Sequence, residues 1–363
     1  MAPVILALKA DPRFSPVLIS SGQHGEMLTQ ALSMFDLFPD FNLEVMEPGQ
    51  SLAILTAKVT SRVDKVLSEI KPDIVLVHGD TTTAFASSVA AFYLGIDVGH
   101  VEAGLRTGNV NRPFPEEFNR QAISRIARWN FAPTDTARIN LLAEAVKPET
   151  IHLIGNTVVD ALNLVVGRMQ DDHRLNALVK TSLEQLVDFD YESTQFVLIT
   201  AHRRENLDGG IDHICQAIAH LAQHNPDTHF IFPVHLNPLV QEISNKYLAD
   251  RANVSLTQPL NYLQFLTLLA KSVLVISDSG GIQEEGVSLN KRVLVTRHET
   301  ERGEGIASGH LTLVGTDRDA IIREATKAIK DSSDPDKKDS LHNPYGDGLS
   351  STRIIDILGN YEK

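Results

Sequence analysis

Acidic side chains follow two short apolar runs in the first half of the sequence. Asp80 comes after Ile74–Val77 in the string HGDTTT, and Glu102 comes directly after Val98–Val101 in VEAGLRTG. A carboxylate at such a place can act as a general acid or base. Asp80 could instead cap a helix, because aspartate is favoured at helix starts. Glu102 lies in a glycine-containing loop, where packing explains a carboxylate poorly, so a chemical role is favoured there.

A third acidic position precedes an arginine at an expected helix start. The string RPFPEEFNR places Glu116 four residues before Arg120, and Pro115 suits the first position of a helix. Glu116 could transfer protons, or it could simply stabilise the positive end of the helix dipole. The sequence leaves these two interpretations open.

The second half carries a histidine and a glycine pair at comparable places. His202, in AHRREN, follows Phe196–Thr200, and histidine suits acid–base work near neutral pH; a solvent-exposed loop is the alternative. After Val273–Ile276, the string SDSGGIQEE predicts an anion cradle, because backbone N–H groups at a helix N-terminus bind phosphate. Glu285 in that helix could accept hydrogen bonds from ribose hydroxyls. An arginine of the later string RHETERGE could pair with a diphosphate, although a solvated charge run is the alternative.

Short β-branched runs alternate with amphipathic stretches along the chain, which predicts an α/β fold of parallel strands and covering helices. Such folds bind ligands at the carboxyl ends of their strands, which is where the residues above are expected to lie. The expected strands are Val17–Ser20, Ile74–Val77, Val98–Val101, Ile151–Ile154, Phe196–Thr200, His229–Pro233, Val273–Ile276 and Arg292–Thr296.

These strands form two series, which predicts two doubly wound parallel-sheet domains. One series ends near Ile154 and the other begins near Phe196, with one helix expected over 158–186 between them. We therefore predict domains at 1–160 and 161–350. A chain of 363 residues agrees with two domains.

Composition argues against several classes of protein. The formal net charge of −13 argues against a nucleic-acid partner, which usually requires a basic stripe. No apolar run reaches the roughly 20 residues that cross a bilayer, so no membrane partner is expected, and the first residues lack the basic segment of a signal peptide. The single cysteine, Cys215, lies in an apolar helical pattern, so we predict a buried packing residue in a cytoplasmic protein. The sequence contains no zinc or EF-hand spacing.

Taken together, the motifs resemble one family along nearly the whole chain. The non-hydrolysing UDP-N-acetylglucosamine 2-epimerases carry similar strings in the same order. In this sequence the strings are HGDTTT, VGHVEAGLRTG, PEEFNRQ, GNTVVDAL, TAHRREN, PVHLNP, SDSGGIQEE and NPYGDG. The resemblance implies two Rossmann-like domains in a GT-B-like arrangement, with the active site in the cleft. It also implies that a C-terminal helix, within 351–363, packs back on the first domain.

The resemblance also implies a reaction. Members interconvert UDP-N-acetylglucosamine and UDP-N-acetylmannosamine, and require no cofactor or metal. They eliminate UDP to give 2-acetamidoglucal and add it back with the configuration at C2 inverted. The product supplies surface polysaccharide synthesis, and relatives are commonly homodimers. A hydrolysing epimerase or glycosyltransferase of related fold, and a UDP-sugar-binding protein without activity, are the alternatives.

Particular residues match the functional positions of this family. The matched acid–base carboxylates are Asp80, Glu102 and Glu116, with Arg120 as a supporting arginine and His202 beside the leaving diphosphate. The matched UDP-binding residues are Phe265 at the uracil, Ser279, Gly280 and Gly281 in the diphosphate cradle, Glu285 at the ribose, and Arg302. Two positions, Gln23 and His235, match a second, allosteric UDP-sugar site.

The sequence departs from the family pattern at several places. Family members begin with a strand and Gly-Thr-Arg-Pro-Glu-Ala-Ile-Lys before Met-Ala-Pro, and this sequence begins at Met-Ala-Pro. We therefore expect the first sheet to lack its central strand, the site to lack one arginine and one lysine, and the natural start to lie upstream. Leu260 replaces a glutamine expected beside the uracil. Glu26 and Gly49 replace a glutamine and an arginine of the allosteric site, so allosteric activation stays open.

Overall fold

The computed structural model describes residues 1–22, 32–47, 49–203, 206–332 and 342–360. The chain divides into two compact units. Unit 1 comprises Met1–Leu164 and Tyr345–Lys363, and unit 2 comprises Val165–Pro344. Each unit is a parallel α/β fold, which confirms the predicted fold class. The described helices include no segment with the length and apolar character that a membrane span requires.

Unit 1 has a sheet of four parallel strands in the order β3-β4-β5-β6 and a separate parallel pair, β1-β2. In the larger sheet Ile74 lies opposite Asp97 and Gly99 opposite Trp129. The strands are β1 (Ile19–Ser20), β2 (Phe41–Asn42), β3 (Ile74–His78), β4 (Asp97–Val101), β5 (Trp129–Ala132) and β6 (Ile151–Leu153). The helices are α1 (Ala2–Ala10), α3 (Leu52–Ile70), α4 (Thr82–Tyr93), α5 (Glu116–Ile126), α6 (Asp135–Ala143), the short 3-10 turn Pro148–Thr150, the start of α7 (Thr157–Asp171), and α15 (Ser350–Gly359).

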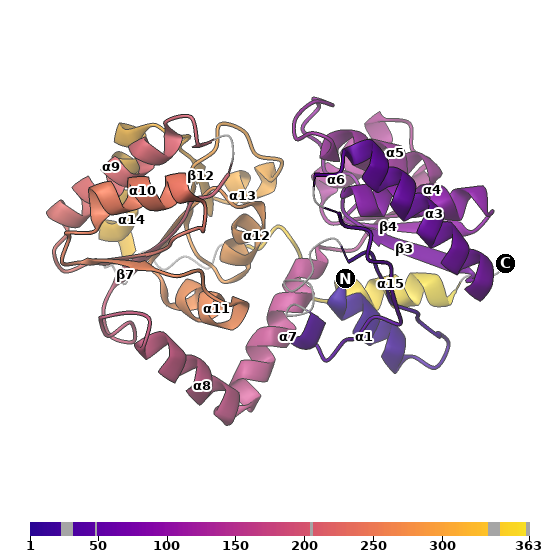
Figure 1. Ribbon diagram of the computed structural model, residues 1–363, viewed down its shortest axis with the longest axis horizontal. Helices are drawn as coiled ribbons and strands as arrows, with labels where there is room; N and C mark the ends of the chain where they lie inside the picture. Colours follow the sequence, from indigo (N-terminus) through magenta and orange to yellow (C-terminus); the bar gives the residue numbers. More distant parts are fainter. Residues whose placement is uncertain (23–31, 48, 204–205, 333–341, 361–363) are drawn as a thin grey trace. The chain divides into compact units, whose positions relative to one another are not determined.

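The C-terminal helix α15 lies beside α1, so the first and last helices of the described chain pack together in unit 1 (Figure 1). Val4, Ile354 and Leu358 pack in one core with Phe131 of β5. The start of α15 is held by the buried carboxylate of Asp160, which accepts hydrogen bonds from the backbone N–H groups of Ser350 (3.2 Å) and Ser351 (2.7 Å). A carboxylate there satisfies N–H groups that have no partner within the helix.

Unit 2 has six parallel strands in the order β12-β11-β10-β7-β8-β9. The order reverses between β7 and β10, and a ligand site is expected at such a switch point. The strands are β7 (Phe196–Thr200), β8 (His229–Pro233), β9 (Val254–Thr257), β10 (Leu274–Ser277), β11 (Val293–Val295) and β12 (Leu311–Leu313). The helices are the end of α7, α8 (His173–Glu184), α9 (Gly210–His224), α10 (Pro238–Leu248), α11 (Tyr262–Lys271), α12 (Gly280–Ser288), α13 (Gly303–Ala307) and α14 (Arg318–Ser332).

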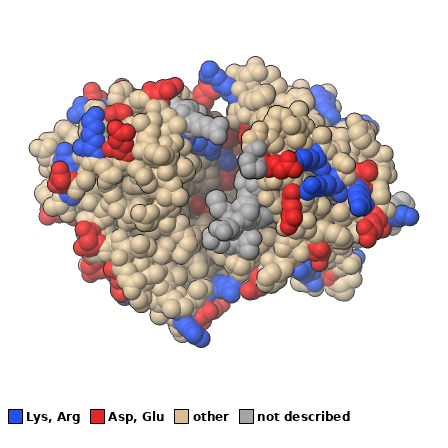
Figure 2. Space-filling model, viewed as in Figure 1, with Lys and Arg blue, Asp and Glu red and all other residues tan. Residues whose placement is uncertain are grey.

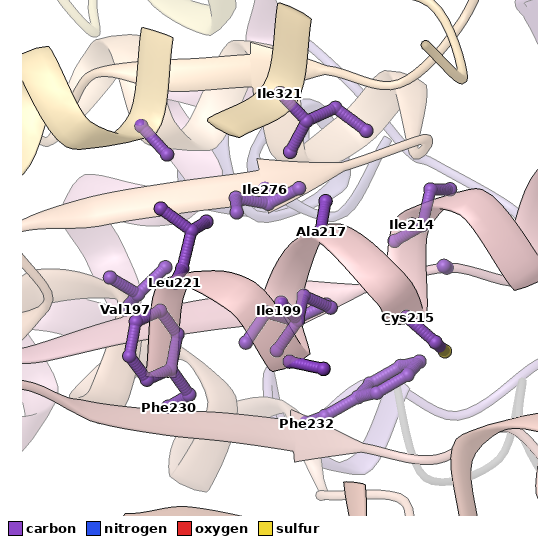
Figure 3. Packing of buried hydrophobic residues seen from close by; sticks show 14 of the residues in the cluster. Val197, Ile199, Ile214, Cys215, Ala217, Leu221, Phe230, Phe232, Ile276 and Ile321 are labelled. Atoms are coloured by element: carbon purple, nitrogen blue, oxygen red, sulfur yellow. The ribbon is translucent and has the colours of Figure 1, made fainter. Parts of the chain in front are cut away.

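The core of unit 2 lies between one face of this sheet and the helices α9, α10 and α14. Alternate residues of the strands point to one face, so Val197 and Ile199 of β7 and Phe230 and Phe232 of β8 all meet α9 (Figure 3). Cys215 lies in this cluster with no exposed surface, and burial raises the pKa of its thiol to about 12. The predicted packing role of Cys215 is therefore confirmed.

The structure corrects three local predictions. The helix expected over 158–186 is two helices, because the Asp172 side chain accepts from the N–H of Leu175 and starts α8 there. Pro115 stands just before α5 as its N-cap residue, not at its first position. The prediction also missed four short strands, because they lack long β-branched runs; these are β2, β5, β9 and β12.

Candidate functional site

Asp80 follows the carboxyl end of β3, and its side chain faces α5. Its interpretation as a helix cap is wrong, because Thr81 is the N-cap of α4 and its hydroxyl accepts from the N–H of Ala84 at 3.1 Å. The Asp80 carboxylate instead pairs with the guanidinium of Arg120, whose side chain is 5% exposed. Asn119 adds a hydrogen bond of 2.8 Å to the Asp80 carbonyl. The predicted carboxylate and its supporting arginine are therefore in direct contact.

Glu102, at the carboxyl end of β4, has a strained backbone. Its φ angle is +67°, in the left-handed region that costs a non-glycine residue about 1–2 kcal/mol. The neighbouring Gly79 has φ +66°, and a Cβ built there would lie 3.1 Å from Glu102 Oε2. The ends of β3 and β4 thus bring Asp80 and Glu102 to the same edge of the sheet. Strain of this kind is concentrated at functional sites.

Glu116 and Glu117 have different roles in the structure. Glu117 has no exposed side-chain surface, and it accepts from the N–H groups of Thr107 (3.1 Å) and Gly108 (3.4 Å), so it holds the loop after β4 against α5. Glu116 lies one helical turn before Arg120, on the same face of α5. Its Oε2 is buried and has no hydrogen-bond partner among the described residues. A buried carboxylate oxygen without a partner is costly, which favours a chemical role over a dipole effect.

Two buried histidines complete this group, and the sequence prediction did not name them. Burial lowers the pKa of His78 and of His100 to about 3, so both are neutral at pH 7. His100 Nε2 lies 2.8 Å from the carbonyl of Gly79, which fixes the turn before Asp80. His78 Nδ1 lies 4.0 Å from Glu102 Oε2. Their signal was present in the strings HGD and GHVE, where both histidines precede the carboxylates by two residues.

In unit 2, His202 stands at the switch point between β7 and β10. Its Nδ1 lies 3.2 Å from Oδ1 of Asp278, which follows β10 and has no exposed side-chain surface. Burial lowers the pKa of His202, while Asp278 opposes this shift. The His202 side chain is 39% exposed, so it can reach a ligand. Asp278 lies in the SDSGG motif, but the sequence prediction did not include it among the site residues.

The predicted anion cradle begins α12. Ser279 is its N-cap residue, and its hydroxyl makes no capping hydrogen bond. The backbone N–H of Ser279 donates to Ser277 Oγ at 3.0 Å, and Ser277 Oγ lies 2.7 Å from Thr200 Oγ1, which links the ends of β7 and β10. A Cβ built at Gly280 would lie 3.0 Å from Arg302 Nη1. The loop therefore brings Ser279, Gly280 and Gly281 beside Arg302.

Arg302 is buried between two carboxylates. Its Nε donates to Glu284 Oε1 at 2.9 Å, and its Nη1 donates to Glu301. The interpretation of 297–304 as a solvated charge run is therefore wrong for Arg302, which is only 8% exposed. Carboxylates on two sides hold the guanidinium in one place, where it can also meet an anion.

Glu285 lies one turn into α12, next to α11. Tyr262 donates a hydrogen bond of 2.8 Å to Glu285 Oε1. Burial raises the pKa of Glu285 to about 7, although the tyrosine opposes this shift. Phe265 is half-buried on α11, one turn after Tyr262. The predicted ribose and uracil residues are thus carried by neighbouring helices.

The two positions predicted for an allosteric site differ in what the structure describes. His235 follows β8, is exposed, and its ring lies 5.7 Å from that of His202 with 17° between the planes. Its Nδ1 accepts from the N–H of Asn237 at 3.1 Å. Gln23 lies outside the described residues.

Among the described residues, the site residues included, no cluster of three or more His, Cys, Asp or Glu side chains could hold a metal ion. On the face shown in Figure 2, acidic and basic side chains are interspersed. The arginines at the two candidate groups, Arg120 and Arg302, are instead buried beside carboxylates.

Known proteins resemble this chain over almost its full length. A family model for UDP-N-acetylglucosamine 2-epimerase matches residues 6–359. A UDP-N-acetylglucosamine 2-epimerase of Salmonella typhimurium is 45% identical over 361 residues, which are 99% of this chain and 95% of the relative. That of Bacillus subtilis is 44% identical over 358 residues, which are 99% of this chain and 91% of the relative.

Solved structures agree with the sequence comparison. The UDP-GlcNAc 2-epimerase of Neisseria meningitidis, bound to UDP-GlcNAc, is similar with a TM-score of 0.90 and 43% identity, covering 99% of this chain and 95% of that one. The Methanocaldococcus jannaschii UDP-GlcNAc 2-epimerase, in complex with UDP-GlcNAc and UDP, has a TM-score of 0.82 and 31% identity, covering 98% and 95%. With the strand-end carboxylates and the Ser-Gly-Gly loop in place, these matches show that the chain belongs to the UDP-N-acetylglucosamine 2-epimerase family.

Proposed function

We propose that this protein interconverts UDP-N-acetylglucosamine and UDP-N-acetylmannosamine by inverting C2 of the sugar. The observation that carries the proposal is the group in unit 1: Asp80 paired with Arg120, Glu116 one turn away, and the strained Glu102 at the next strand end. Inversion needs proton transfer on both faces of one carbon, so more than one carboxylate is required. A glycosyltransferase of related fold would not need all three.

The proposed reaction has two balanced halves. A carboxylate removes the proton at C2, and the C1–oxygen bond breaks with its electron pair leaving on UDP, which gives 2-acetamidoglucal. UDP then adds back to C1 while C2 accepts a proton on the opposite face. The C2 proton is weakly acidic, so a positioned base and stabilisation of the leaving diphosphate are both needed. The acid–base residues we propose are Asp80, Glu102 and Glu116, with Arg120 supporting Asp80.

Unit 2 supplies the groups proposed to bind UDP throughout the reaction. Ser279, Gly280 and Gly281 offer backbone N–H groups at the start of α12, where the helix dipole favours an anion. Arg302, held beside Gly280, adds a positive charge. Glu285 is proposed to accept from the ribose hydroxyls and Phe265 to contact the uracil. His202 is proposed to stabilise the leaving oxygen of the diphosphate.

The test is turnover of UDP-N-acetylglucosamine in deuterated water, followed by NMR at C2. We expect deuterium at C2 together with the signals of UDP-N-acetylmannosamine. Free N-acetylmannosamine and UDP in place of the nucleotide sugar would assign a hydrolysing epimerase. UDP binding by calorimetry with no turnover, in a folded protein, would show a binding protein and refute the proposal.

Three broader aspects of the proposal go beyond the reaction. We propose that the protein is cytoplasmic, that it forms a homodimer, and that its product supplies surface polysaccharide synthesis. Phe92 and Tyr93, at the end of α4, are 55% and 74% exposed and give unit 1 an apolar surface that a second copy could cover. Light scattering should give twice the mass of one chain, and Tyr93→Glu should reduce it; a monomeric wild-type protein would contradict the dimer.

A further inference from the structure

Asp278 is a fully buried carboxylate whose two oxygens have different surroundings. Its Oδ2 accepts three hydrogen bonds, from the backbone N–H groups of His202 (2.8 Å) and Arg203 (2.8 Å) and from the side chain of Asn206 (3.0 Å). These bonds hold the loop after β7 against the end of β10. The structural role of Asp278 therefore uses only one of its oxygens.

The other oxygen points to the imidazole of His202. Asp278 Oδ1 is buried and accepts no well-aligned hydrogen bond from the described residues. It nevertheless lies 3.2 Å from His202 Nδ1. A buried carboxylate oxygen without a partner is costly, and a small rotation of the half-exposed ring would complete a bond from Nδ1–H. Asp278 and His202 thus form a carboxylate–imidazole pair that lacks only this alignment.

The charged surroundings make Asp278 the main stabiliser of a protonated His202. Burial, the Arg203 guanidinium and the His235 ring all lower the pKa of His202, and Asp278 is the group that raises it. The groups that face the imidazole are Asp278 after β10, Arg203 on the same loop and His235 after β8. With Nδ1 donating to Asp278, only the protonated ring can also donate from Nε2.

We infer that Asp278 is a positioning residue that holds the Nδ1 edge of His202, so that Nε2–H donates to the departing diphosphate. The inference rests on the proposed function and adds a residue to it. The C1–oxygen bond breaks toward UDP, and the charge that develops on the leaving oxygen is met by Nε2–H of the imidazolium. On re-addition the same hydrogen bond is released as the C1–oxygen bond forms again.

Asp278→Asn tests this directly. The amide oxygen can keep the three bonds now made to Oδ2, and its NH₂ then faces His202 Nδ1. Nδ1 of His202 must then accept a hydrogen bond, so the neutral ring carries its proton on Nε2. The protonated ring of His202 also loses the negative charge of Asp278 that stabilises it. The neutral Nε2–H is a weaker donor than the imidazolium, so we expect kcat to fall by about 10-fold or more with little change in KM. The alkaline limb of kcat should move to lower pH by about one unit.

The matched control is Asp188→Asn. Asp188 also accompanies a histidine in unit 2, with 3.9 Å between its Oδ1 and His229 Nε2, but this pair lies at the opposite, amino ends of the strands. We expect Asp188→Asn to leave kcat, KM and the pH profile of turnover unchanged. Asp278→Glu should restore part of the lost activity, because it returns the charge.

A second measurement tests the contact between Asp278 and His202 independently of turnover. Nitrogen-15 NMR of histidine-labelled protein, with His202→Gln to assign the signal, reports whether Nδ1 carries a proton. We expect a protonated Nδ1 in the wild type and an unprotonated Nδ1 in Asp278→Asn. An Nδ1 signal that is identical in both proteins would overturn the inference. A shifted signal in a protein that has no epimerase activity would instead keep the pair and refute the proposed function.

Discussion

The Arg120 guanidinium and the Asp80 carboxylate form an ion pair that joins the end of β3 to α5. The guanidinium is 5% exposed and the carboxylate 26%. Arg120 Nη1 also lies 3.4 Å from the fully buried Glu117, so one arginine serves two carboxylates. A buried charge that loses its partner is strongly unfavourable, and this pair therefore links stability to the geometry of the site.

Removing this arginine should affect both properties. Arg120→Gln should lower turnover by about 100-fold or more, because Asp80 loses the contact that orients it. It should also lower the free energy of unfolding by about 2–4 kcal/mol, since Glu117 is left buried without a cation. Turnover by NMR and urea unfolding measure the two effects.

Arg128→Gln is the control for Arg120. Arg128 pairs with Asp97 at 2.8 Å in the same unit, but the two side chains are 48% and 32% exposed. An exposed ion pair contributes about 0–1 kcal/mol, so this variant should keep nearly all of its stability and turnover. Equal losses in the two variants would contradict a special role for Arg120.

The backbone strain at Glu102 predicts that one substitution will raise stability and abolish activity. Glu102→Gly should abolish turnover, because it removes a proposed acid–base carboxylate. It should also raise the free energy of unfolding by about 0.5–1 kcal/mol, because glycine adopts positive φ without steric cost. Urea unfolding measures this gain.

Lys71→Gly offers a matched comparison for Glu102. Lys71 is exposed, ends α3 with φ +45°, and lies outside the proposed site. It should show a similar gain in stability with normal turnover. A loss of several kcal/mol in Glu102→Gly alone would show that contacts of the Glu102 side chain outweigh the strain.

The raised pKa of Glu285 predicts a dependence of stability on pH. Its folded pKa of about 7 lies above the ordinary value of 4.5. A raised pKa means that the folded state binds the proton more tightly, so this contribution is fully present below about pH 4.5 and is lost as pH rises through 7. Glu285→Gln should therefore be more stable than the wild type at pH 8, by about 1–3 kcal/mol, and similar to it near pH 4.5. Thermal unfolding at the two pH values measures this difference.

Tyr262→Phe tests the Glu285 carboxylate by removing the hydroxyl that donates to it. The tyrosine hydroxyl donates to Glu285 and lowers its pKa, so its removal should raise that pKa further. If the carboxylate accepts from the ribose, the affinity for UDP should weaken as pH falls, with a midpoint that moves to higher pH in Tyr262→Phe. Calorimetry of UDP binding from pH 6 to 9 measures the midpoint, and an unchanged midpoint would remove Tyr262 from the site.

Replacing Gly104 by alanine should destabilise the protein, both through backbone strain and through steric overlap of the added methyl group. Gly104 has φ +91°, and a Cβ built there would lie 2.3 Å from the carbonyl of Ala137 in α6. Gly104→Ala should therefore lower the free energy of unfolding by about 2 kcal/mol or more. Gly95→Ala, where φ is +69° and the added Cβ meets no atom within 4 Å, should lose only the strain energy. Similar losses in urea unfolding would show that α6 moves away to accommodate the methyl group.

Alternation of apolar runs and helices was enough to predict the fold class, because buried parallel strands are short and β-branched wherever they occur. The same pattern placed His202 and Asp80 at strand ends. It missed β5 and β9, because their residue types do not form a recognisable strand pattern. These segments become strands by pairing with neighbouring strands of the sheets. Strands of this kind are defined by their partners, which a local pattern does not contain.

Residue types and spacing by themselves determined that this chain is a parallel α/β protein, and they placed Asp80, Glu102 and the Ser-Gly-Gly motif at strand ends. Only the tertiary structure decided between the open interpretations. Thr81, not Asp80, caps α4, because hydrogen-bond geometry selects one of two suitable neighbours. Asp278 meets His202, 76 residues away in the sequence, because β7 and β10 are adjacent in the sheet. Such contacts depend on strand order, and strand order is set by the packing of the whole unit.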